Sequence, residues 1–465
     1  MNSAAMMTQP PQPGFFKRHG TVIRMITICV MVMFLMIPLA MIESVLKERM
    51  YRRNGVVGEI SSTWGAEQTI NGPVLMVPYI TWITVIKEKT VNGKEEKIPE
   101  LQSRIAYAYF LPASLKISGI LDPNVLHRGI YEAVVYSGTL HLSGSFTKPV
   151  FDEWGVKPED VIWKDATVSF MITDLRGTKD VISLKWGDKS IPLATGSKIK
   201  ENPSGLHARL GASPFDGDSS NFELAVALNG SGSINFAPLG GCTEVKLSSS
   251  WPDPSFRGSF LPVERKISTE GFEAIWQMSC YGRAYPQQGA VTVSGSLPFS
   301  TDAVKASLFG VSLISVVDSY RYVERSIKYG ALFIVLAFTA FFLFEILSQL
   351  RIHPFQYTLV GVALSMFYLT LLSLSEFINF GLAYLAGAVA AIGLITFYSA
   401  YVLKSFRRAS VMAVGLTAIY GFLYVILRQQ DYSLLFGTVG LFIVLAVVMY
   451  VTRHIDWYAR DERVK

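Results

Sequence analysis

The sequence predicts a mixed membrane protein: one N-terminal transmembrane helix, a large β-rich domain that is antiparallel and sandwich-like, and a C-terminal bundle of five transmembrane helices. Two observations support this class. Six apolar stretches without charges occupy residues 25–42, 329–344, 355–375, 377–403, 409–427 and 432–452. The long segment between the first two stretches instead has short runs of β-forming residues, punctuated by Gly, Pro, Asn and Asp.

The lengths of the apolar stretches fit membrane helices. With about 1.5 Å of rise per residue, roughly 20 apolar residues cross the ~30 Å hydrocarbon layer. The stretch 329–344 is short, so we extend that helix to about residue 350, which places Glu345 at the interface. The bundle is therefore predicted at 329–452, followed by a short tail at 453–465.

The N-terminal region is predicted to be a disordered tail at 1–20 and a retained helix at 21–43. Pro10, Pro11 and Pro13 oppose regular structure in the tail. A cleaved signal peptide is the alternative for the helix. Its apolar core is longer than that of most signal peptides, no Ala-x-Ala-like site follows it, and residues 42–49 continue a helical pattern, which favours retention.

Residues 44–328 are predicted to form the β-rich domain. Short strand-like runs lie at 105–110, 140–146, 167–172 and 244–247, and Asn92-Gly93 is a strong hairpin signal. Many short strands favour an antiparallel sandwich over a doubly wound sheet. Similarity between 110–133 and 260–274 leaves two duplicated modules open, and sequence alone does not decide whether Cys242 and Cys280 form a disulfide.

The distribution of Lys and Arg predicts the orientation, because cations beside membrane helices stay on the cytoplasmic side. Cation-rich segments alternate with cation-poor ones. The rich segments contain Lys17, Arg18 and Arg24; Arg351; Lys404, Arg407 and Arg408; and Arg453, Arg460, Arg463 and Lys465. Both termini are therefore predicted to be cytoplasmic, and residues from about 43 to 328 to be periplasmic, in the inner membrane of a Gram-negative cell.

The formal net charge of +6 follows from this topology. The basic residues in excess lie in the cytoplasmic segments, while the middle domain has equal numbers of acidic and basic residues. A neutral exported domain argues against nucleic acid as a partner. The lipid bilayer is the one partner that composition predicts directly.

Sequence motifs of catalysis are missing. The chain has no phosphate-binding Gly-rich loop ending in Lys-Ser or Lys-Thr, no His-Glu-x-x-His and no Gly-x-Ser-x-Gly. Its six His are scattered, and the spacing of His127 and His141 identifies no third metal ligand. We therefore expect no enzyme activity, no cofactor and no metal site.

Four sequence blocks resemble the CreD family of inner-membrane proteins. They are WPDPSFRGSFLP at 251–262 with GFEAIW at 271–276, FEILSQLRIHPFQY at 344–357, GPVLMVP at 72–78 and RHIDWY at 453–458. They extend over nearly the whole chain. The resemblance implies a role in cell envelope integrity, with links to envelope stress, tolerance of certain colicins and a two-component regulatory system. It supplies no catalytic residues.

Two groups of residues are candidates for function. Trp251, Phe256 and Arg257 are residue types that anchor protein interfaces, although a Pro-rich aromatic loop also suits a buried structural corner. The second group contains the ionisable residues in or near the bundle, Glu345, Arg351, His353 and Glu376. Such residues are often functional in membranes, but an ion-paired junction beside water explains them equally simply.

Two functions follow. The first is an envelope integrity or stress-response protein that binds an envelope component or partner protein through its periplasmic domain. The alternative is a small-solute transporter or membrane-embedded enzyme centred on the bundle. The scarcity of charges inside the spans and the lack of matching Gly- and Pro-interrupted helices favour the first.

The charge pattern generates a topology prediction. Reporter fusions at residue 407 should report a cytoplasmic location, and fusions at residues 150 and 300 a periplasmic one, because the first site lies in a cation-rich segment between two membrane helices and the others lie in the neutral middle domain. Paired alkaline phosphatase and green fluorescent protein fusions measure both outcomes. A cytoplasmic signal from the middle domain would contradict the assigned orientation.

Overall fold

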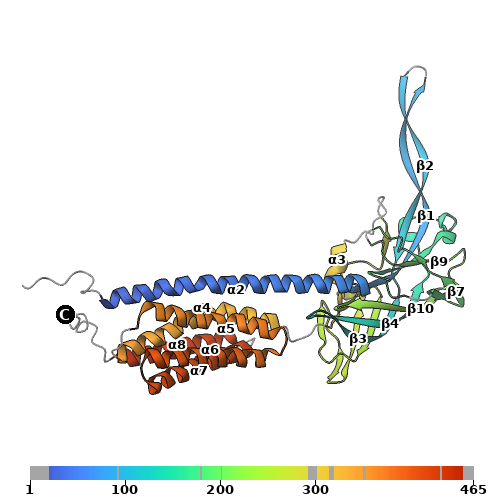
Figure 1. Cartoon of the computed structure of the whole chain (residues 1–465). Coiled ribbons are helices and arrows are strands. Elements are labelled where there is room, and N and C mark those ends of the chain that lie inside the picture. The colour runs from blue at the N-terminus through green and yellow to red at the C-terminus, as the bar shows by residue number, and fades with distance from the viewer. Residues whose placement is uncertain are drawn as a thin grey trace, which may run out of the picture. The chain divides into compact units, whose positions relative to one another are not determined.

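The computed structural model describes residues 20–91, 94–178, 181–200, 202–291, 301–313, 319–348, 352–429 and 432–453. The chain divides into two compact units. We call Asn54–Val316 the β unit, and Met1–Arg53 together with Val317–Lys465 the membrane unit. The described residues include six helices that are long and apolar enough to cross a membrane. The predicted class is confirmed: one N-terminal apolar helix, a large β-rich domain and five C-terminal apolar helices (Figure 1).

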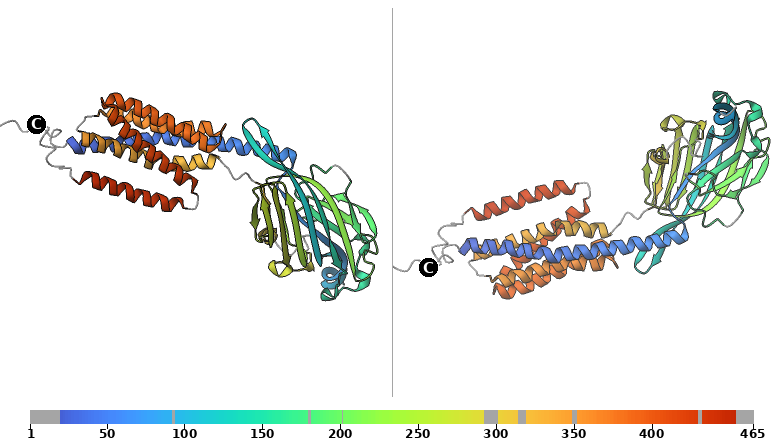
Figure 2. Two further views of the ribbon diagram at one scale, coloured as in Figure 1. Left: turned by 90° about the horizontal axis from the view of Figure 1, so that it is seen from below. Right: turned by 90° about the horizontal axis from the view of Figure 1, so that it is seen from above.

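The membrane unit contains the predicted apolar stretches as regular helices (Figure 2). They are α4 (Ser319–Ser348), α5 (Pro354–Ser375), α6 (Phe380–Val402), α7 (Phe406–Arg428) and α8 (Ser433–Thr452). Local capping sets two of the starts. The His353 side chain caps α5, and Asn379 Oδ1 accepts a hydrogen bond from the Leu382 N–H at 3.0 Å at the start of α6.

Helix α4 begins ten residues earlier than the apolar stretch at 329. Its first turns contain charges, so hydropathy does not detect them. The Lys328 ammonium lies 2.8 Å from the Glu324 carboxylate, one turn away, which is a spacing that supports helices. The early turns are thus a polar extension of a membrane helix.

Helix α2 (Gly20–Trp64) is much longer than a membrane requires. Its 45 residues span about 68 Å, more than twice the hydrocarbon thickness. The helical pattern at 42–49 therefore continues to Trp64. The helix belongs to the membrane unit up to Arg53 and to the β unit from Asn54.

One sheet of the β unit has nine strands among the described residues. Its main path is β13 (Ser255–Gly258), β17 (Phe309–Ser312), β11 (Ser233–Phe236), β1 (Gln68–Val91), β5 (Thr167–Ile172), β9 (Leu206–Arg209) and β8 (Ala194–Thr195). Strand β2 (Lys94–Phe110) pairs with β1, and β16 (Gln288–Ala290) pairs with β2. The short helix α3 (Thr301–Ala306) precedes β17.

The second sheet has eight strands in the described part of the chain. Its order is β14 (Glu264–Ser268), β15 (Gly271–Ser279), β12 (Cys242–Ser249), β3 (Ser114–Arg128), β4 (Tyr131–Thr147), β10 (Ser219–Ser231), β6 (Ser183–Trp186) and β7 (Lys189–Pro192). Buried and exposed residues alternate along β10 and β12, as expected when one face of a sheet covers a core. Among the described residues, four single-turn 3-10 helices connect strands: Asp152–Trp154, Pro158–Asp160, Trp163–Asp165 and Cys280–Gly282.

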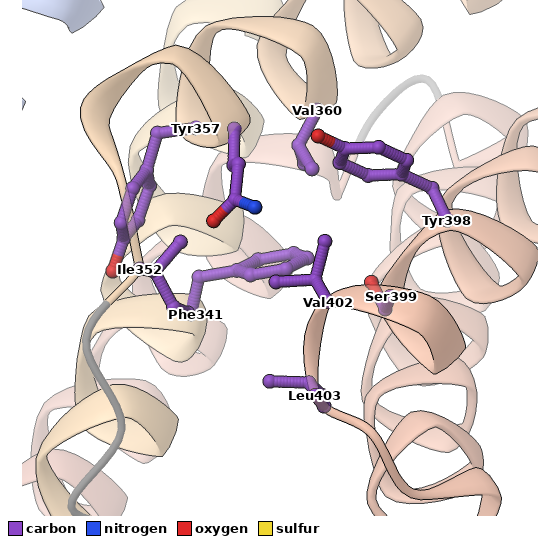
Figure 3. A pocket seen from close by; sticks show the side chains of 9 residues that line it. Phe341, Ile352, Tyr357, Val360, Tyr398, Ser399, Val402 and Leu403 are labelled. Atoms are coloured by element: carbon purple, nitrogen blue, oxygen red, sulfur yellow. The ribbon is translucent and has the colours of Figure 1, made fainter.

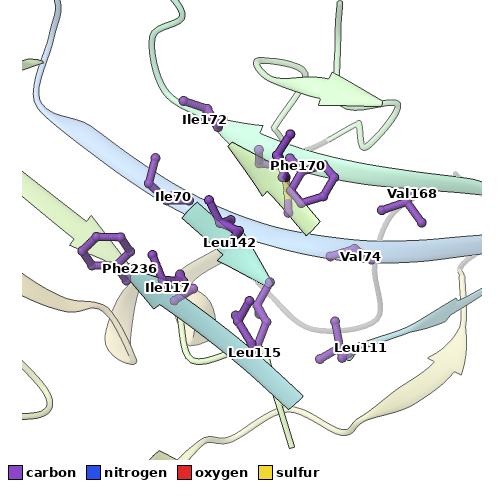
Figure 4. Packing of buried hydrophobic residues seen from close by; sticks show 14 of the residues in the cluster. Ile70, Val74, Leu111, Leu115, Ile117, Leu142, Val168, Phe170, Ile172 and Phe236 are labelled. Carbon is purple, nitrogen blue, oxygen red and sulfur yellow. The ribbon is translucent and has the colours of Figure 1, made fainter. Parts of the chain in front are cut away.

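The two sheets enclose one apolar core. Figure 4 shows side chains of β1 and β5, including Ile70 and Phe170, packed together with Leu115, Ile117 and Leu142 of β3 and β4. The sheets are mixed, since β1 pairs with β11 and β12 pairs with β3 in parallel, while the other pairings are antiparallel. Sequence patterns predicted the sandwich-like layers but not these two parallel pairs, because they join strands far apart in the chain.

The predicted hairpin is confirmed by the pairing of β1 with β2, which runs from Leu75 with Phe110 to Val91 with Lys94. Asn92 and Gly93 themselves lie outside the described residues. Both cysteines of the β unit are free thiols, and the register places Ser279, not Cys280, opposite Cys242. The two similar segments at 110–133 and 260–274 contribute the β3–β4 and β14–β15 hairpins of one sheet. Their duplication stays a prediction.

A buried carboxylate joins the end of α2 to the sheets. Asp174, which is 8% exposed, accepts hydrogen bonds from the Ala66 N–H at 3.1 Å and from the Arg176 N–H at 2.9 Å. The Arg176 guanidinium also binds this carboxylate and donates to the Ser62 carbonyl in the last turn of α2. Burial raises the pKa of Asp174, but these hydrogen bonds outweigh it, and the pKa is lowered overall.

The lowered pKa of Asp174 predicts a pH-dependent stability. A carboxyl group whose pKa is lower in the folded state stabilises the fold above its unfolded pKa of about 4, and this contribution is lost as pH falls through the folded pKa. Asp174→Asn should therefore cost about 1.5–3 kcal/mol at pH 7. The difference from the unsubstituted protein should shrink below pH 4. Denaturation of the full chain in detergent, followed by Trp fluorescence, measures both.

The matched control is Asp188→Asn, which changes an exposed carboxylate on the β6–β7 turn. It should leave stability within about 0.5 kcal/mol of the unsubstituted protein at both pH values. Equal effects of the two substitutions, or a difference for Asp174→Asn that does not change with pH, would contradict the role assigned to Asp174.

Candidate functional site

The predicted intramembrane residues lie at two separate junctions of the bundle. Glu345 and His353 are beside the start of α5, and Glu376 follows its last residue. Because α5 has 22 residues, its ends are about 33 Å apart. Arg351 lies outside the described residues. The predicted residues thus do not form one polar centre.

At the first junction, Glu345 is a buried carboxylate that accepts hydrogen bonds from a tyrosine and from a backbone N–H. It is 4% exposed, and its Oε2 atom accepts a hydrogen bond from the Tyr357 hydroxyl at 2.7 Å. Its Oε1 atom accepts a longer one, at 3.4 Å, from the Ile352 N–H. These contacts link the last turn of α4 to the first turn of α5 and the residue that precedes its cap.

His353 acts as the N-cap of α5. Its Nδ1 atom accepts a hydrogen bond from the Phe355 N–H at 3.2 Å, while the backbone N–H of His353 donates to Gln356 Oε1 at 3.0 Å. This reciprocal arrangement is a capping box, which satisfies backbone donors at the start of a helix. The side chain of His353 is exposed, and its contacts are structural.

At the second junction, Glu376 connects α2, α4 and α5. The Tyr320 hydroxyl donates to Glu376 Oε1 at 3.1 Å, and Arg49 Nε lies 3.8 Å from the same oxygen. The guanidinium of Arg53 lies over the Tyr320 ring, 5.8 Å from its centroid. The Glu376 side chain is only 9% exposed, so pairing with Arg49 compensates part of the cost of its burial.

Three cavities in the described part of the bundle are small or apolar. The first, of about 10 Å³, lies between Phe341, Tyr357 and Tyr398 (Figure 3). A second has the same volume, and a third of about 170 Å³ lies between α4, α7 and α8. A volume of 10 Å³ holds at most one water molecule. No charged residue lines any of the three.

Aromatic residues that the sequence analysis did not select form the centre of the bundle. The Phe367 ring lies 4.7 Å from Tyr420 and 5.2 Å from Tyr384, measured between centroids, and the Tyr384 hydroxyl donates to the Tyr420 carbonyl at 2.6 Å. Gly387 on α6 permits this packing, because a Cβ atom there would meet the Phe367 ring at 3.3 Å. The arrangement is a tightly packed core with one satisfied hydroxyl.

In the β unit, the predicted interaction residues lie at an edge of the nine-stranded sheet. Phe256 on β13 is half-buried, with its ring 5.8 Å from Phe272 and 5.6 Å from Trp276. Arg257 Nη2 lies 3.5 Å from Glu67 Oε2. Trp251 Nε1 donates to the Asp253 carbonyl at 3.1 Å, within its own loop. These contacts favour the structural-corner alternative for this block.

A second cluster of the β unit carries no sequence motif. Arg283 donates to the carbonyls of Pro238 and Leu239 at 3.0 and 2.7 Å, and its guanidinium lies 4.8 Å from the Tyr285 ring centroid. Burial lowers the pKa of Arg283 and raises that of the neighbouring Tyr109 to about 12. The cluster fastens chain segments far apart in the sequence. Within the described residues, no three His, Cys, Asp or Glu side chains gather as a metal site.

The fold defines a class before any comparison: a multi-pass membrane protein whose large β-sandwich unit is inserted between its first and second membrane helices. The family model described as Inner membrane protein CreD matches residues 20–458. The chain is also 33% identical, over 431 residues and 92% of both chains, to the Inner membrane protein CreD of Escherichia coli (strain K12). The chain belongs to the CreD family of inner-membrane proteins.

The contacts of Phe256 generate a stability prediction. Phe256→Ala should cost about 2 kcal/mol, less than the 3–5 kcal/mol of a fully buried Phe, because the ring is half-buried against Phe272 and Trp276. The control is Tyr281→Ala, which removes an aromatic ring that is 94% exposed and should be nearly neutral. Urea denaturation of the full chain in detergent compares them. An unchanged stability for Phe256→Ala, together with lost function in cells, would favour a binding surface instead.

Proposed function

We propose that this CreD-family protein maintains cell envelope integrity or takes part in the envelope stress response. In this proposal both termini are cytoplasmic and the β unit is periplasmic. The β unit acts by binding an envelope component or a partner protein, and the chain catalyses no reaction. The membrane unit anchors it in the bilayer and contributes to signal relay across the membrane.

The single observation that carries the proposal is that the ionisable residues of the bundle make structural contacts within the protein. Glu345 accepts from a tyrosine and a backbone N–H, His353 caps a helix, and Glu376 pairs with Arg49 and Tyr320. A transport or catalytic site requires polar groups that face a cavity large enough for a substrate. The three cavities described above have no charged lining residue. These observations support our proposal that the functional surface lies in the β unit.

The orientation is supported by where cations fall relative to the helix ends. Lys404 and Arg407 lie at the α6–α7 connection, and Arg453 follows α8. The α5–α6 connection at the opposite end contains Glu376 and no cation. This asymmetry is the pattern that retains the cation-rich side in the cytoplasm.

Complementation of a strain that lacks this chain tests the proposal. Replacing residues 54–316 by an unrelated exported domain should abolish protection against envelope stress while leaving membrane abundance normal. Glu345→Gln and His353→Ala should retain protection at a matched level of folded protein, because those side chains have structural contacts. The readout is survival under detergent or colicin challenge.

The transporter alternative gives the opposite pattern. It expects lost protection in Glu345→Gln and His353→Ala at normal membrane abundance, with protection kept when the β unit is replaced. Immunoblots of isolated membranes and protease resistance verify abundance and folding for each variant.

A further inference from the structure

The outer part of the β1–β2 hairpin forms a ribbon of two strands. Strand β5 pairs with β1 only as far as Met76, and β16 pairs with β2 only at Ala108 and beyond. In the described residues, the outermost β-bridge that β1 makes with a segment other than β2 is the one between Tyr79 and Val161. We call residues 80–87 and 98–105, which pair only with each other, the ribbon. Figure 1 shows it projecting from the rest of the β unit.

The ribbon has one apolar face without charge. Residues directly opposite each other in an antiparallel pair lie on the same face, and each face takes every second residue. The register pairs Ile80 with Ile105, Trp82 with Ser103, Thr84 with Leu101, and Ile86 with Pro99. We call these eight residues the apolar face. Four of its five large apolar side chains are more than half exposed, Trp82 59%, Ile86 65%, Leu101 69% and Ile105 56%, while Ile80 is half-buried.

The opposite face is polar and internally paired. It contains Lys87, Glu100, Gln102 and Arg104 together with Thr81, Ile83, Val85 and Ile98. The Lys87 ammonium lies 2.6 Å from the Glu100 carboxylate. This polar face is therefore suited to remain exposed to water. In the described part of the chain, no layer covers the apolar face.

An uncovered apolar face of this kind needs a partner. A two-stranded ribbon is at best marginally stable in water, and it gains stability when a hydrophobic face packs on another layer. Exposed apolar side chains contiguous over several residues mark interaction sites. The described part of the β unit supplies no strand beside the ribbon, so the covering layer must come from elsewhere.

We infer that the apolar face docks on the apolar face of a second copy of this chain. A two-fold contact brings the same residues together from both copies, so it buries no charge when the face has none. The exposed apolar area is on the order of 500 Å² per copy, the size of a weak interface. Confinement of both copies to one membrane raises their effective concentration, so a weak contact suffices.

A lipid surface fits the ribbon less well. In the described part of the chain, no further strand pairs with either outer edge of the ribbon, and backbone N–H and C=O groups at a sheet edge are costly to bury in hydrocarbon. The outer end of the hairpin, residues 87–100, contains four Lys and four Glu, so it has no net positive charge to attract anionic lipids. Face-to-face packing of two ribbons leaves the edges and these charges in water.

Site-specific crosslinking tests the contact with a matched pair of neighbouring residues. Ser103 is on the apolar face beside Trp82, and Gln102 is on the polar face; both are exposed. In the full chain with Cys29, Cys242 and Cys280 replaced by Ser, Ser103→Cys and Gln102→Cys are expressed separately in cells. A short bismaleimide is added to their membranes. We expect a covalent dimer with Ser103→Cys at a yield at least fivefold that of Gln102→Cys.

Two further measurements identify the product and the face. Coexpression of two differently tagged copies should give a product with both tags. Adding Trp82→Ser and Leu101→Ser to the Ser103→Cys chain should reduce the dimer yield several-fold, and unchanged denaturation of this chain shows that folding is intact.

Four outcomes would overturn the inference. Equal yields at the two positions indicate random collision, and an adduct of Ser103→Cys with a different protein indicates another partner. A thiol at 103 that forms no dimer yet reacts freely with a water-soluble maleimide indicates an uncovered face. One that forms no dimer and reacts only with a lipid-soluble maleimide indicates insertion into the bilayer.

Discussion

Gln68 and Asp174 form the buried, reciprocal hydrogen-bond pair on which the β unit depends. Gln68 Nε2 donates to the carbonyls of Asp174 and Asn229, at 2.8 and 2.6 Å, and its Oε1 accepts from the Asp174 N–H at 3.3 Å. Gln68 begins β1, the strand that pairs with β2, β5 and β11, while Asn229 is on β10 in the other sheet. The fully buried side-chain amide of Gln68 thus links both sheets. The carboxylate of Asp174 connects this pair to the chain at the end of α2, through the Ala66 N–H. A buried network of this kind stabilises only when every member is satisfied, which constrains this corner to one arrangement.

The fold could be predicted from the sequence where the determining interactions are local. Apolar stretches define membrane helices because burial in lipid depends on each segment's own composition, and α5 and α6 begin where His353 and Asn379 cap them. The first turns of α4 were missed because their charges hide a helix that Glu324 and Lys328 support. Strand order could not be read, because the pairings of β1 with β11 and of β3 with β12 join segments more than a hundred residues apart.

The candidate sites could likewise be predicted from residue type, but not where they depend on contacts between distant segments. Residue type identified Glu345 and Glu376 as unusual, but only the structure shows that they lie at opposite ends of α5 with different partners. Asp174 and Arg283 have no motif, since their partners come from distant segments. The first strand of the ribbon could be predicted from the sequence, because Trp82, Thr84 and Ile86 alternate with Ile83, Val85 and Lys87. The register between β1 and β2 decides which residues of β2 share a face with each of these two sets, and therefore which face has no charge. In the sequence, only the Asn92-Gly93 turn signal indicates that register.

The contacts of Glu345 show how a carboxylate is accommodated near the start of α5. A carboxylate accepts hydrogen bonds, and the Tyr357 hydroxyl and the Ile352 N–H both donate to Glu345. The Ile352 N–H precedes α5, so it has no partner inside that helix. The carboxylate thus accepts from a backbone group just before α5 that no hydrogen bond within that helix satisfies, which links α4 to the start of α5. Glu376 links the other end of α5 to α2 and α4 through Arg49 and Tyr320. The contacts of these polar residues thereby link the helices of the bundle to one another.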